Sequence, residues 1–193
     1  LPCMVYPQDQ REAMAHFRGV AEATDLPIMI YNNRVAYKVD LTPESFVELS
    51  DVDNIIAVKE SSHDSRRITD MYNACKDRYQ MFCGVDDLVL ENVLFGAQGW
   101  VAGLVNSFPK ESVRLFELAR EGRVDEALEI YRWFMPLLHL DVDVKLVQMI
   151  KLANQIAGEG SEWVRRPRLT LEGEERRMVT ELVETAIANR PNL

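Results

Sequence analysis

The sequence predicts an α/β fold built on a parallel sheet. Short apolar runs recur about every 20 to 28 residues, a spacing that suits a strand, a crossover helix and two loops. The runs are continuously apolar rather than alternating, as in strands that are covered on both faces. An amphipathic helical pattern follows each run. The five predicted strands are Leu1–Tyr6, Pro27–Tyr31, Ile55–Lys59, Tyr79–Gly84 and Trp100–Leu104.

The helices expected between these strands begin at clear N-terminal signals. An aspartate precedes three of them, and Thr42-Pro43-Glu44 begins another with proline at the first helical position. The predicted helices are Gln10–Thr24, the one that begins at Thr42-Pro43-Glu44, Arg66–Cys75, and Leu88–Phe95, which stops at Gly96.

After Pro109 the strand pattern ends and helical patterns take over. The helices predicted there are Pro109–Glu121, Val124–Leu140, Val144–Ala157 and Glu172–Asn189. We therefore expect residues 1–121 to hold five βα units and residues 122–193 to form a helical C-terminal extension.

Composition and charge narrow the classes of function. The chain has 193 residues, with 22 Lys and Arg against 31 Asp and Glu, and a formal net charge of −9. This acid excess argues against nucleic acid and against an anionic membrane surface as partners. No apolar run approaches the ~20 residues that span a bilayer. The first six residues are too short and lack the leading positive charge of a signal peptide.

The cysteines and histidines do not form a metal-site pattern. Cys3, Cys75 and Cys83 are scattered and lack CxxC spacing, so neither a disulfide framework nor a zinc site is expected. No histidine pairs with another histidine or a carboxylate at ligand spacing. We expect no metal, no cofactor and a reducing cytoplasm as the compartment.

The ends of the second and third predicted strands carry candidate reactive groups. In parallel α/β folds such groups lie at the carboxyl ends of strands. Alternation places Ile55, Ala57 and Lys59 on one face. A partly desolvated Lys59 would have a lowered pKa and could form a Schiff base with a small carbonyl substrate. Tyr31 could shuttle protons near that imine. The alternative is that Lys59 is a solvated charge and Tyr31 is packing.

The sequence around these two residues resembles a known family. Ile30-Tyr31-Asn32-Asn33 is followed, 28 positions after the tyrosine, by Val58-Lys59-Glu60-Ser61-Ser62. This pair resembles the signature of the dihydrodipicolinate synthase/N-acetylneuraminate lyase family. Further similar motifs, in the family's order, are Cys83-Gly84-Val85-Asp86-Asp87, residues 96–106 with Pro109 after them, and Arg168-Leu169-Thr170-Leu171.

The resemblance implies a (β/α)8 TIM barrel with a helical C-terminal extension and class I aldolase chemistry. Lys59 would form the Schiff base with a 2-oxo acid such as pyruvate, and Tyr31 would relay protons. The pocket would be lined near Gly84 and along Val101, Ala102 and Gly103. The resemblance also implies chemistry without a metal or organic cofactor, and a homo-oligomer, either a dimer or a tetramer.

The chain departs from the family in length and at one tyrosine. Five predicted strands correspond to about strands four to eight of a barrel, and the family's Thr-Thr or Ser-Thr carboxylate-binding pair has no counterpart. We expect an incomplete copy of a normal enzyme. Met4 and Val5 align with the tyrosine pair that the family often places at its fourth strand end, although Tyr6, one position later, could substitute.

A third departure concerns the substrate. Dihydrodipicolinate synthases carry an arginine five residues after the tyrosine, where this chain has Ala36, and Arg34 replaces the usual proline. Arg34 is either a displaced carboxylate binder or a surface loop residue. The chain most resembles the catabolic branch, and within it 1-pyrroline-4-hydroxy-2-carboxylate deaminases.

The resemblance therefore favours a Schiff-base-forming lyase acting on a 2-oxo acid or cyclic imine acid. Two alternatives stay open: a dihydrodipicolinate synthase or pyruvate-dependent sugar-acid aldolase, and a catalytically silent barrel with a binding or assembly role.

Overall fold

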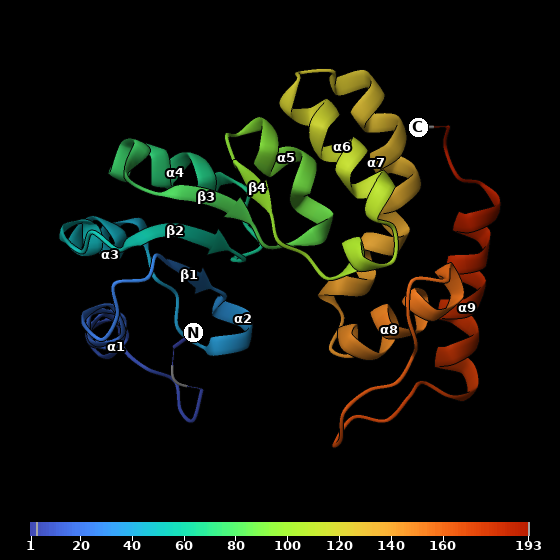
Figure 1. The fold of residues 1–193 in the computed structure, drawn as a ribbon, viewed down its shortest axis with the longest axis horizontal. Coiled ribbons are helices and arrows are strands. Elements are labelled where there is room, and N and C mark those ends of the chain that lie inside the picture. Colours follow the sequence, from blue (N-terminus) through green and yellow to red (C-terminus); the bar gives the residue numbers. More distant parts are fainter. Residues whose placement is uncertain (3, 193) are drawn as a thin grey trace. The chain divides into compact units, whose positions relative to one another are not determined.

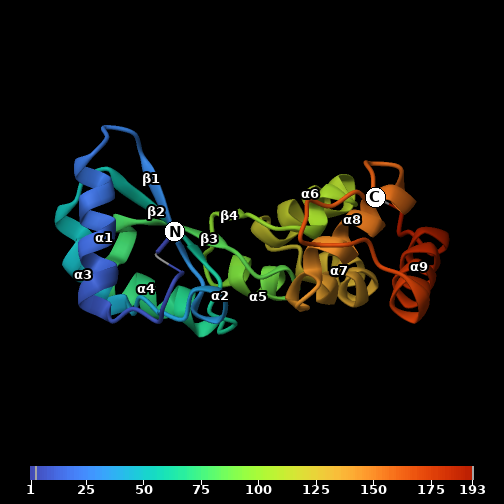
Figure 2. The ribbon, with the colours of Figure 1, turned by 90° about the horizontal axis from the view of Figure 1, so that it is seen from below.

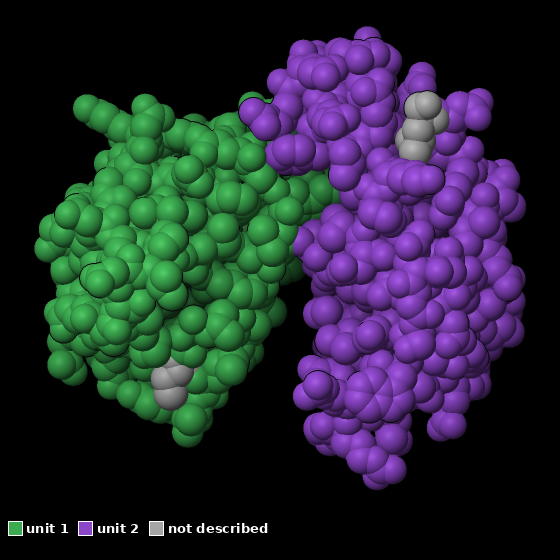
Figure 3. Space-filling model, in the orientation of Figure 1, with its two compact units in different colours: residues 1–101 green, residues 102–193 purple. Residues whose placement is uncertain are grey.

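Four parallel strands form one sheet in the part of the chain that the computed structural model describes, residues 1–2 and 4–192. The strands follow one another in chain order, β1-β2-β3-β4 (Figure 1). They lie in the first of two units, residues 1–101, and the second unit begins at Ala102 (Figure 3). The strands are β1 (Ile28–Asn32), β2 (Ile55–Glu60), β3 (Gln80–Cys83) and β4 (Gly99–Trp100). The prediction of an α/β fold with a parallel sheet is confirmed.

The register between β1 and β2 changes by one residue near its start. Ile28 is opposite Ile55, but the next residue, Met29, is opposite Ala57. Ile56 is therefore an extra residue in β2, as in a β-bulge. From that point the register is regular and sets Tyr31 opposite Lys59.

One face of the sheet forms the core of this unit. Ile30, Val58 and Met81 are neighbours across β1, β2 and β3, and each is at most 1% exposed. Their burial explains why these three positions are apolar, because the helices that connect the strands cover this face. The helices of this unit are α1 (Gln10–Glu22), α2 (Arg34–Tyr37), α3 (Pro43–Glu48), α4 (Arg66–Cys75) and α5 (Val89–Leu94).

Local sequence determines where these helices start. Asp9 accepts a hydrogen bond from the Glu12 backbone N–H, and the Glu12 carboxylate accepts one from the Asp9 N–H, which forms a capping box at α1. Pro43 occupies the first turn of α3, where its missing N–H costs nothing. The predicted helix over Arg66–Cys75 has the bounds of α4. The short helix α2 was not predicted.

The first predicted strand is wrong for the residues described. Apart from Cys3, which is not described, residues 1–6 form no strand, and Val5 is 91% exposed. Pro2 within this segment and Pro7 directly after it have no backbone N–H to donate to a sheet. The segment is instead held by side chains, since Tyr6 donates a hydrogen bond to the Glu12 carboxylate.

The last predicted strand is shorter than expected. Only Gly99 and Trp100 form β4, and Leu104–Asn106 is a turn of 3-10 helix. The Val101 N–H still donates to the Cys83 carbonyl at 2.9 Å, and the chain leaves the sheet after this bond. Gly103, two residues after Val101, belongs to the second unit.

In the second unit, the described residues 102–192 form helices joined by loops, with no strand among them (Figure 2). The Trp133 indole N–H donates to the Ala186 carbonyl and so joins α7 to α9. Gly158 ends α8 in the left-handed conformation, with φ 82°, which favours glycine. All four helices predicted after Pro109 are confirmed within a few residues. They are α6 (Pro109–Arg120), α7 (Val124–Leu138), α8 (Leu146–Ala157) and α9 (Gly173–Ala188). The division of the chain into residues 1–121 and 122–193 stays a prediction.

Candidate active site

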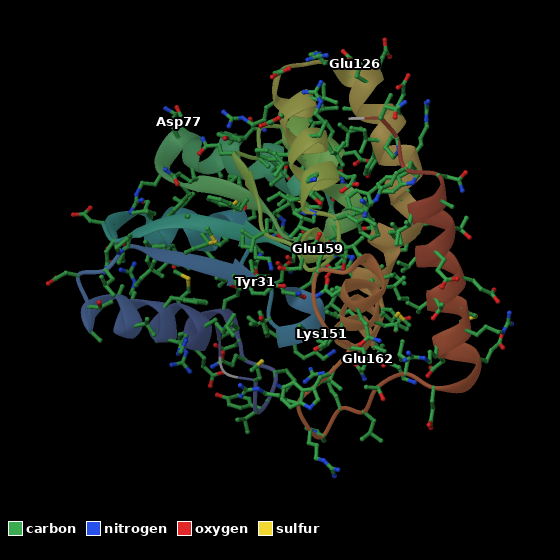
Figure 4. The ribbon with its side chains drawn as sticks, turned by 45° about the vertical axis from the view of Figure 1, so that its right-hand side comes forward. Tyr31, Asp77, Glu126, Lys151, Glu159 and Glu162 are labelled. Atoms are coloured by element: carbon green, nitrogen blue, oxygen red, sulfur yellow. The ribbon has the colours of Figure 1, made fainter. Side chains whose placement is uncertain are left out.

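Lys59 and Tyr31 lie together at the carboxyl ends of two neighbouring strands. They are opposite each other in the β1–β2 register, so both side chains leave the same face of the sheet. The Lys59 Nζ atom lies 4.0 Å from the centre of the Tyr31 ring. Both side chains are half-buried. Figure 4 shows Tyr31 at the end of β1. The structure thus brings these two residues together, while their chemical roles stay predictions.

Gly84 leaves room for the Lys59 side chain. A Cβ atom at Gly84 would lie 2.8 Å from Lys59 Cγ, 2.7 Å from Lys59 Cε and 2.1 Å from Ser61 Oγ. Real Cβ atoms do not approach other atoms so closely. The Gly84 backbone is also fixed, because its N–H donates to the Glu60 carbonyl at 2.9 Å. Only glycine therefore allows the lysine to take this path along the end of β3.

The Tyr31 ring and hydroxyl are each held by a neighbour. The Tyr37 ring meets the Tyr31 ring edge-on, with 5.4 Å between the centroids. Burial raises the pKa of Tyr37, and the nearby Tyr31 adds to this effect. The Asn33 side-chain amide donates a hydrogen bond to the Tyr31 hydroxyl oxygen at 3.2 Å. Tyr31 therefore presents a fixed ring to Lys59.

On the opposite face, a buried carboxylate holds the two strand ends together. Glu60 follows Lys59 and is 3% exposed. One of its oxygens accepts a hydrogen bond from Asn32 Nδ2 at 3.0 Å, and the other accepts from the Ser62 N–H at 2.7 Å. Burial raises the pKa of Glu60, while these bonds and the nearby Arg67 charge oppose the rise.

Asn32 and Arg67 extend this polar network away from Lys59. Asn32 Oδ1 accepts from the Leu41 N–H, and Asn32 Nδ2 donates to the Leu41 carbonyl, both at 3.0 Å. Arg67 on α4 pairs with Asp40 at 2.8 Å. The network ties β1, β2, α4 and the segment after α2 to one another behind the reactive face. Sequence patterns did not single out Glu60 and Asn32, because polar residues at strand ends usually face solvent.

The hydroxyls of Ser61 and Ser62 are buried next to this network. Both residues are 1% exposed, and neither hydroxyl makes a hydrogen bond to a residue within the described ranges. Ser61 Oγ adjoins the Lys59 side chain at Gly84.

The four remaining predicted pocket residues lie on α2 and after β4. Arg34 is exposed at the first position of α2, and Val101 is 40% exposed at the end of its unit. Ala102 and Gly103 begin the second unit. There a Cβ atom at Gly103 would lie 2.6 Å from Ile150 Cδ1, so this glycine is closely packed. The pocket-lining roles of these four residues stay predictions.

Neither a metal centre nor a membrane span is found in the described part of the chain. Within residues 1–2 and 4–192, no three His, Cys, Asp or Glu side chains are grouped so that they could hold a metal ion. None of the helices there is both long and apolar enough to cross a bilayer. Cys3 lies outside the described residues.

Comparison with protein families and curated relatives identifies the chain's family. The family model "Dihydrodipicolinate synthetase family" matches residues 3–186. A 4-hydroxy-tetrahydrodipicolinate synthase 2 from Halalkalibacterium halodurans is 30% identical over 180 residues, which are 93% of this chain and 62% of that protein. A 4-hydroxy-tetrahydrodipicolinate synthase from Exiguobacterium sibiricum is 36% identical over 129 residues, which are 67% of this chain and 44% of that protein. The chain spans less than two thirds of the length of these relatives.

Solved structures agree with this likeness. YagE, a prophage protein of the dihydrodipicolinic acid synthase family from E. coli K12 in complex with pyruvate, is 25% identical with a TM-score of 0.86. The match covers 95% of this chain and 64% of YagE. The dihydrodipicolinate synthase from Aquifex aeolicus is 26% identical, also with a TM-score of 0.86, over 96% of this chain and 64% of that one. These likenesses confirm the expected partial barrel followed by helices. The chain belongs to the dihydrodipicolinate synthetase family.

Proposed function

We propose that this chain provides the Schiff-base lysine of a lyase that acts on a 2-oxo acid or a cyclic imine acid. The observation that carries the proposal is the position of Lys59 Nζ, 4.0 Å from the centre of the Tyr31 ring at the carboxyl ends of β1 and β2. An amine and a phenol so close together can form an imine and move protons around it.

Imine formation assigns a role to each of these two side chains. The neutral Lys59 nitrogen bonds to the carbonyl carbon of the substrate, and the carbonyl oxygen becomes a hydroxyl. That oxygen then leaves as water, and the two hydrogens of this water balance the two that the amine loses. Tyr31 carries these protons by giving its own proton to the oxygen and taking one from the nitrogen. The product is an imine between Lys59 and the substrate.

The relatives favour a pyruvate-like substrate. YagE is described in complex with pyruvate, and the curated relatives named above are 4-hydroxy-tetrahydrodipicolinate synthases. We therefore propose pyruvate or a related 2-oxo acid as the group that reaches Lys59.

A finer candidate is deamination of 1-pyrroline-4-hydroxy-2-carboxylate. It is favoured by Ala36, which stands where dihydrodipicolinate synthases carry an arginine, and by Arg34 in place of proline. Lys59 would attack the imine carbon, and water would leave from the hydroxyl-bearing carbon. Hydrolysis with two waters would then release ammonia and regenerate the lysine. An exposed Arg34 is free to meet a substrate carboxylate from solvent.

Borohydride trapping tests the proposal. The purified protein is incubated with pyruvate, reduced, and digested for peptide mapping by mass spectrometry. We expect one reduced pyruvate on Lys59, no adduct at this site in Lys59→Ala, and an unchanged adduct in Lys110→Ala, which removes an exposed lysine of α6. A protein that is not trapped by either pyruvate or the cyclic imine would be a silent barrel.

Product analysis then separates the chemistries. Deamination of the cyclic imine releases ammonia, whereas aldol cleavage of a sugar-acid releases pyruvate. Condensation of pyruvate with an aldehyde would instead consume pyruvate, as expected of a dihydrodipicolinate synthase.

A further inference from the structure

The hydrogen bond between Asn33 and Tyr31 has a determined direction. Asn33 precedes α2, and its Oδ1 accepts a hydrogen bond from the Ala36 N–H at 2.9 Å. A backbone N–H can only donate, so the oxygen of the Asn33 side chain must face Ala36. The nitrogen of the same amide must then face the Tyr31 hydroxyl, which lies 3.2 Å away. The cap of α2 thus fixes the orientation of the amide.

This orientation determines what the Tyr31 hydroxyl can do. A tyrosine hydroxyl has one proton to donate and can accept further hydrogen bonds. Because Asn33 Nδ2 is a donor, it occupies an acceptor position of the Tyr31 oxygen and cannot take the phenolic proton. The proton is therefore kept for another acceptor. The Tyr31 ring already lies beside Lys59 Nζ, so that acceptor can be an atom bound to the lysine.

We propose that Asn33 is a positioning residue that keeps the Tyr31 hydroxyl a proton donor toward the imine-forming atoms on Lys59. The inference rests on the proposed function, because it assigns the direction of proton transfer in the same site. It also gives a role to Asn33, which lies within the motif Ile30-Tyr31-Asn32-Asn33 but had no function assigned to it. The carbinolamine oxygen receives the Tyr31 proton when it leaves as water, and the proton that the nitrogen loses restores the phenol.

Three variants of Asn33 separate the cap from the hydroxyl contact. Asn33→Asp and Asn33→Ser both keep a good N-cap oxygen for Ala36, whereas Asn33→Ala removes it. Neither Asp nor Ser retains the amide donor to Tyr31. In addition, the carboxylate of Asp is an acceptor and would draw the phenolic proton toward itself. If the role of Asn33 is purely structural, the activities of the variants should follow their thermal stabilities. Asn33→Asp and Asn33→Ser should then be close to wild type, and Asn33→Ala should be lowest.

The positioning role predicts a different order of activity. We expect Asn33→Ser to lower the rate of imine formation with pyruvate by roughly 5- to 10-fold, the equivalent of one neutral hydrogen bond, with little change in melting temperature. Asn33→Asp should be slower still, although it is as stable as the Ser variant. The rate of imine formation is measured by adding borohydride after increasing reaction times and quantifying the reduced Lys59 adduct by mass spectrometry.

A double-mutant cycle with Tyr31→Phe completes the test. Without the phenolic hydroxyl, Asn33→Ser should have no further effect on the rate, because its action passes through that hydroxyl. Additive effects of the two substitutions, or equal activity of the Asp, Ser and wild-type proteins, would overturn the inference. If Lys59 of the wild-type protein is not trapped at all, the proposed function itself is rejected. Trapping of the wild type at the same rate as every Asn33 variant rejects only the role of Asn33.

Discussion

The Lys59 Nζ atom and the Tyr31 ring centre are 4.0 Å apart, although 28 positions separate the two residues in the chain. This distance depends on neighbouring parallel strands that end together and on the free space beside Gly84. The pair therefore responds to changes in the backbone around it as well as to changes in its own side chains.

Gly84→Ala is expected to impair Lys59 without unfolding the protein. The new Cβ would overlap Lys59 Cε and Ser61 Oγ, so the lysine must leave its position beside Tyr31. A displacement of about 1 Å at a reacting atom can cost roughly 100-fold in rate. We expect a loss of this order in trapping with pyruvate, with a native circular dichroism spectrum. Gly19→Ala is the matched control, since nothing lies within 4 Å of its new Cβ. Wild-type trapping by Gly84→Ala would contradict this account.

Glu60→Gln should change how stability depends on pH. Burial raises the folded-state pKa of Glu60 above its ordinary value of 4.5. The stability linked to this raised pKa is fully present below the unfolded value and is lost as pH rises through the folded value. Glutamine does not titrate, and it loses one of the two acceptor contacts of Glu60, at a cost of about 1 kcal/mol. The variant should therefore be clearly less stable than wild type near pH 4.5, and the gap should narrow toward pH 8.

Urea unfolding at several pH values measures this gap. Glu159→Gln, which changes an exposed side chain, controls for the loss of one surface charge. A gap that widens as pH rises would mean that the bonds from Asn32 and Ser62 outweigh burial.

Cys83 should resist alkylation in the folded protein. The residue is fully buried, and burial raises its thiol pKa to about 12. The thiolate is the reactive form, so little of it is present at pH 8. Burial also raises the pKa of Cys75, but this residue is partly accessible. We expect iodoacetamide to label Cys75 before Cys83 in the folded protein. After unfolding in urea, the two cysteines should be labelled at similar rates. Equal alkylation rates of Cys75 and Cys83 in the folded protein would contradict the full burial of Cys83.

Arg78→Lys should destabilise the first unit. The Arg78 guanidinium donates hydrogen bonds to the carbonyls of Ser50, Val52 and Ile55 at 2.7 to 2.9 Å, and its Cζ atom lies 4.7 Å from the Tyr79 ring centre. Lysine keeps the charge but not the fork that reaches three carbonyls. We expect a loss of about 2–3 kcal/mol in the free energy of unfolding.

The control for Arg78 is Arg66→Lys, whose side chain is 82% exposed. Its ion pair with Asp64 lies at the surface, so the substitution should have a much smaller effect on the free energy of unfolding than Arg78→Lys. Similar losses from both substitutions would show that the carbonyl contacts of Arg78 add little.

The apolar pattern predicts most of this fold because burial is periodic. It places a helix over Arg66–Cys75, the bounds of α4, and strands near β1, β2 and β3. It fails for Leu1–Tyr6, because an apolar segment becomes a strand only when another strand pairs with it, and no local pattern encodes that pairing. It extends the last strand too far for the same reason, since pairing with β3 ends at Val101.

The same limits apply to the candidate site. Strand alternation and the family motifs bring Lys59 and Tyr31 to one place, as the structure confirms. The contacts of Asn33 and Glu60 could not be predicted in this way. The direction of the Asn33 amide depends on the unpredicted helix α2, and the burial of Glu60 depends on α4 and the segment after α2.

The extra residue in β2 determines which side chains can meet. If the pairing of Ile28 with Ile55 continued without interruption, Tyr31 would stand opposite Val58, and its ring would emerge from the face of the sheet opposite to that of Lys59. Ile56 shifts the pairing register of β2 against β1 by one residue, so that the Tyr31 phenol and the Lys59 amine share a face. A single extra residue within β2, three positions before Lys59, thus decides whether the two groups share a face and can react together.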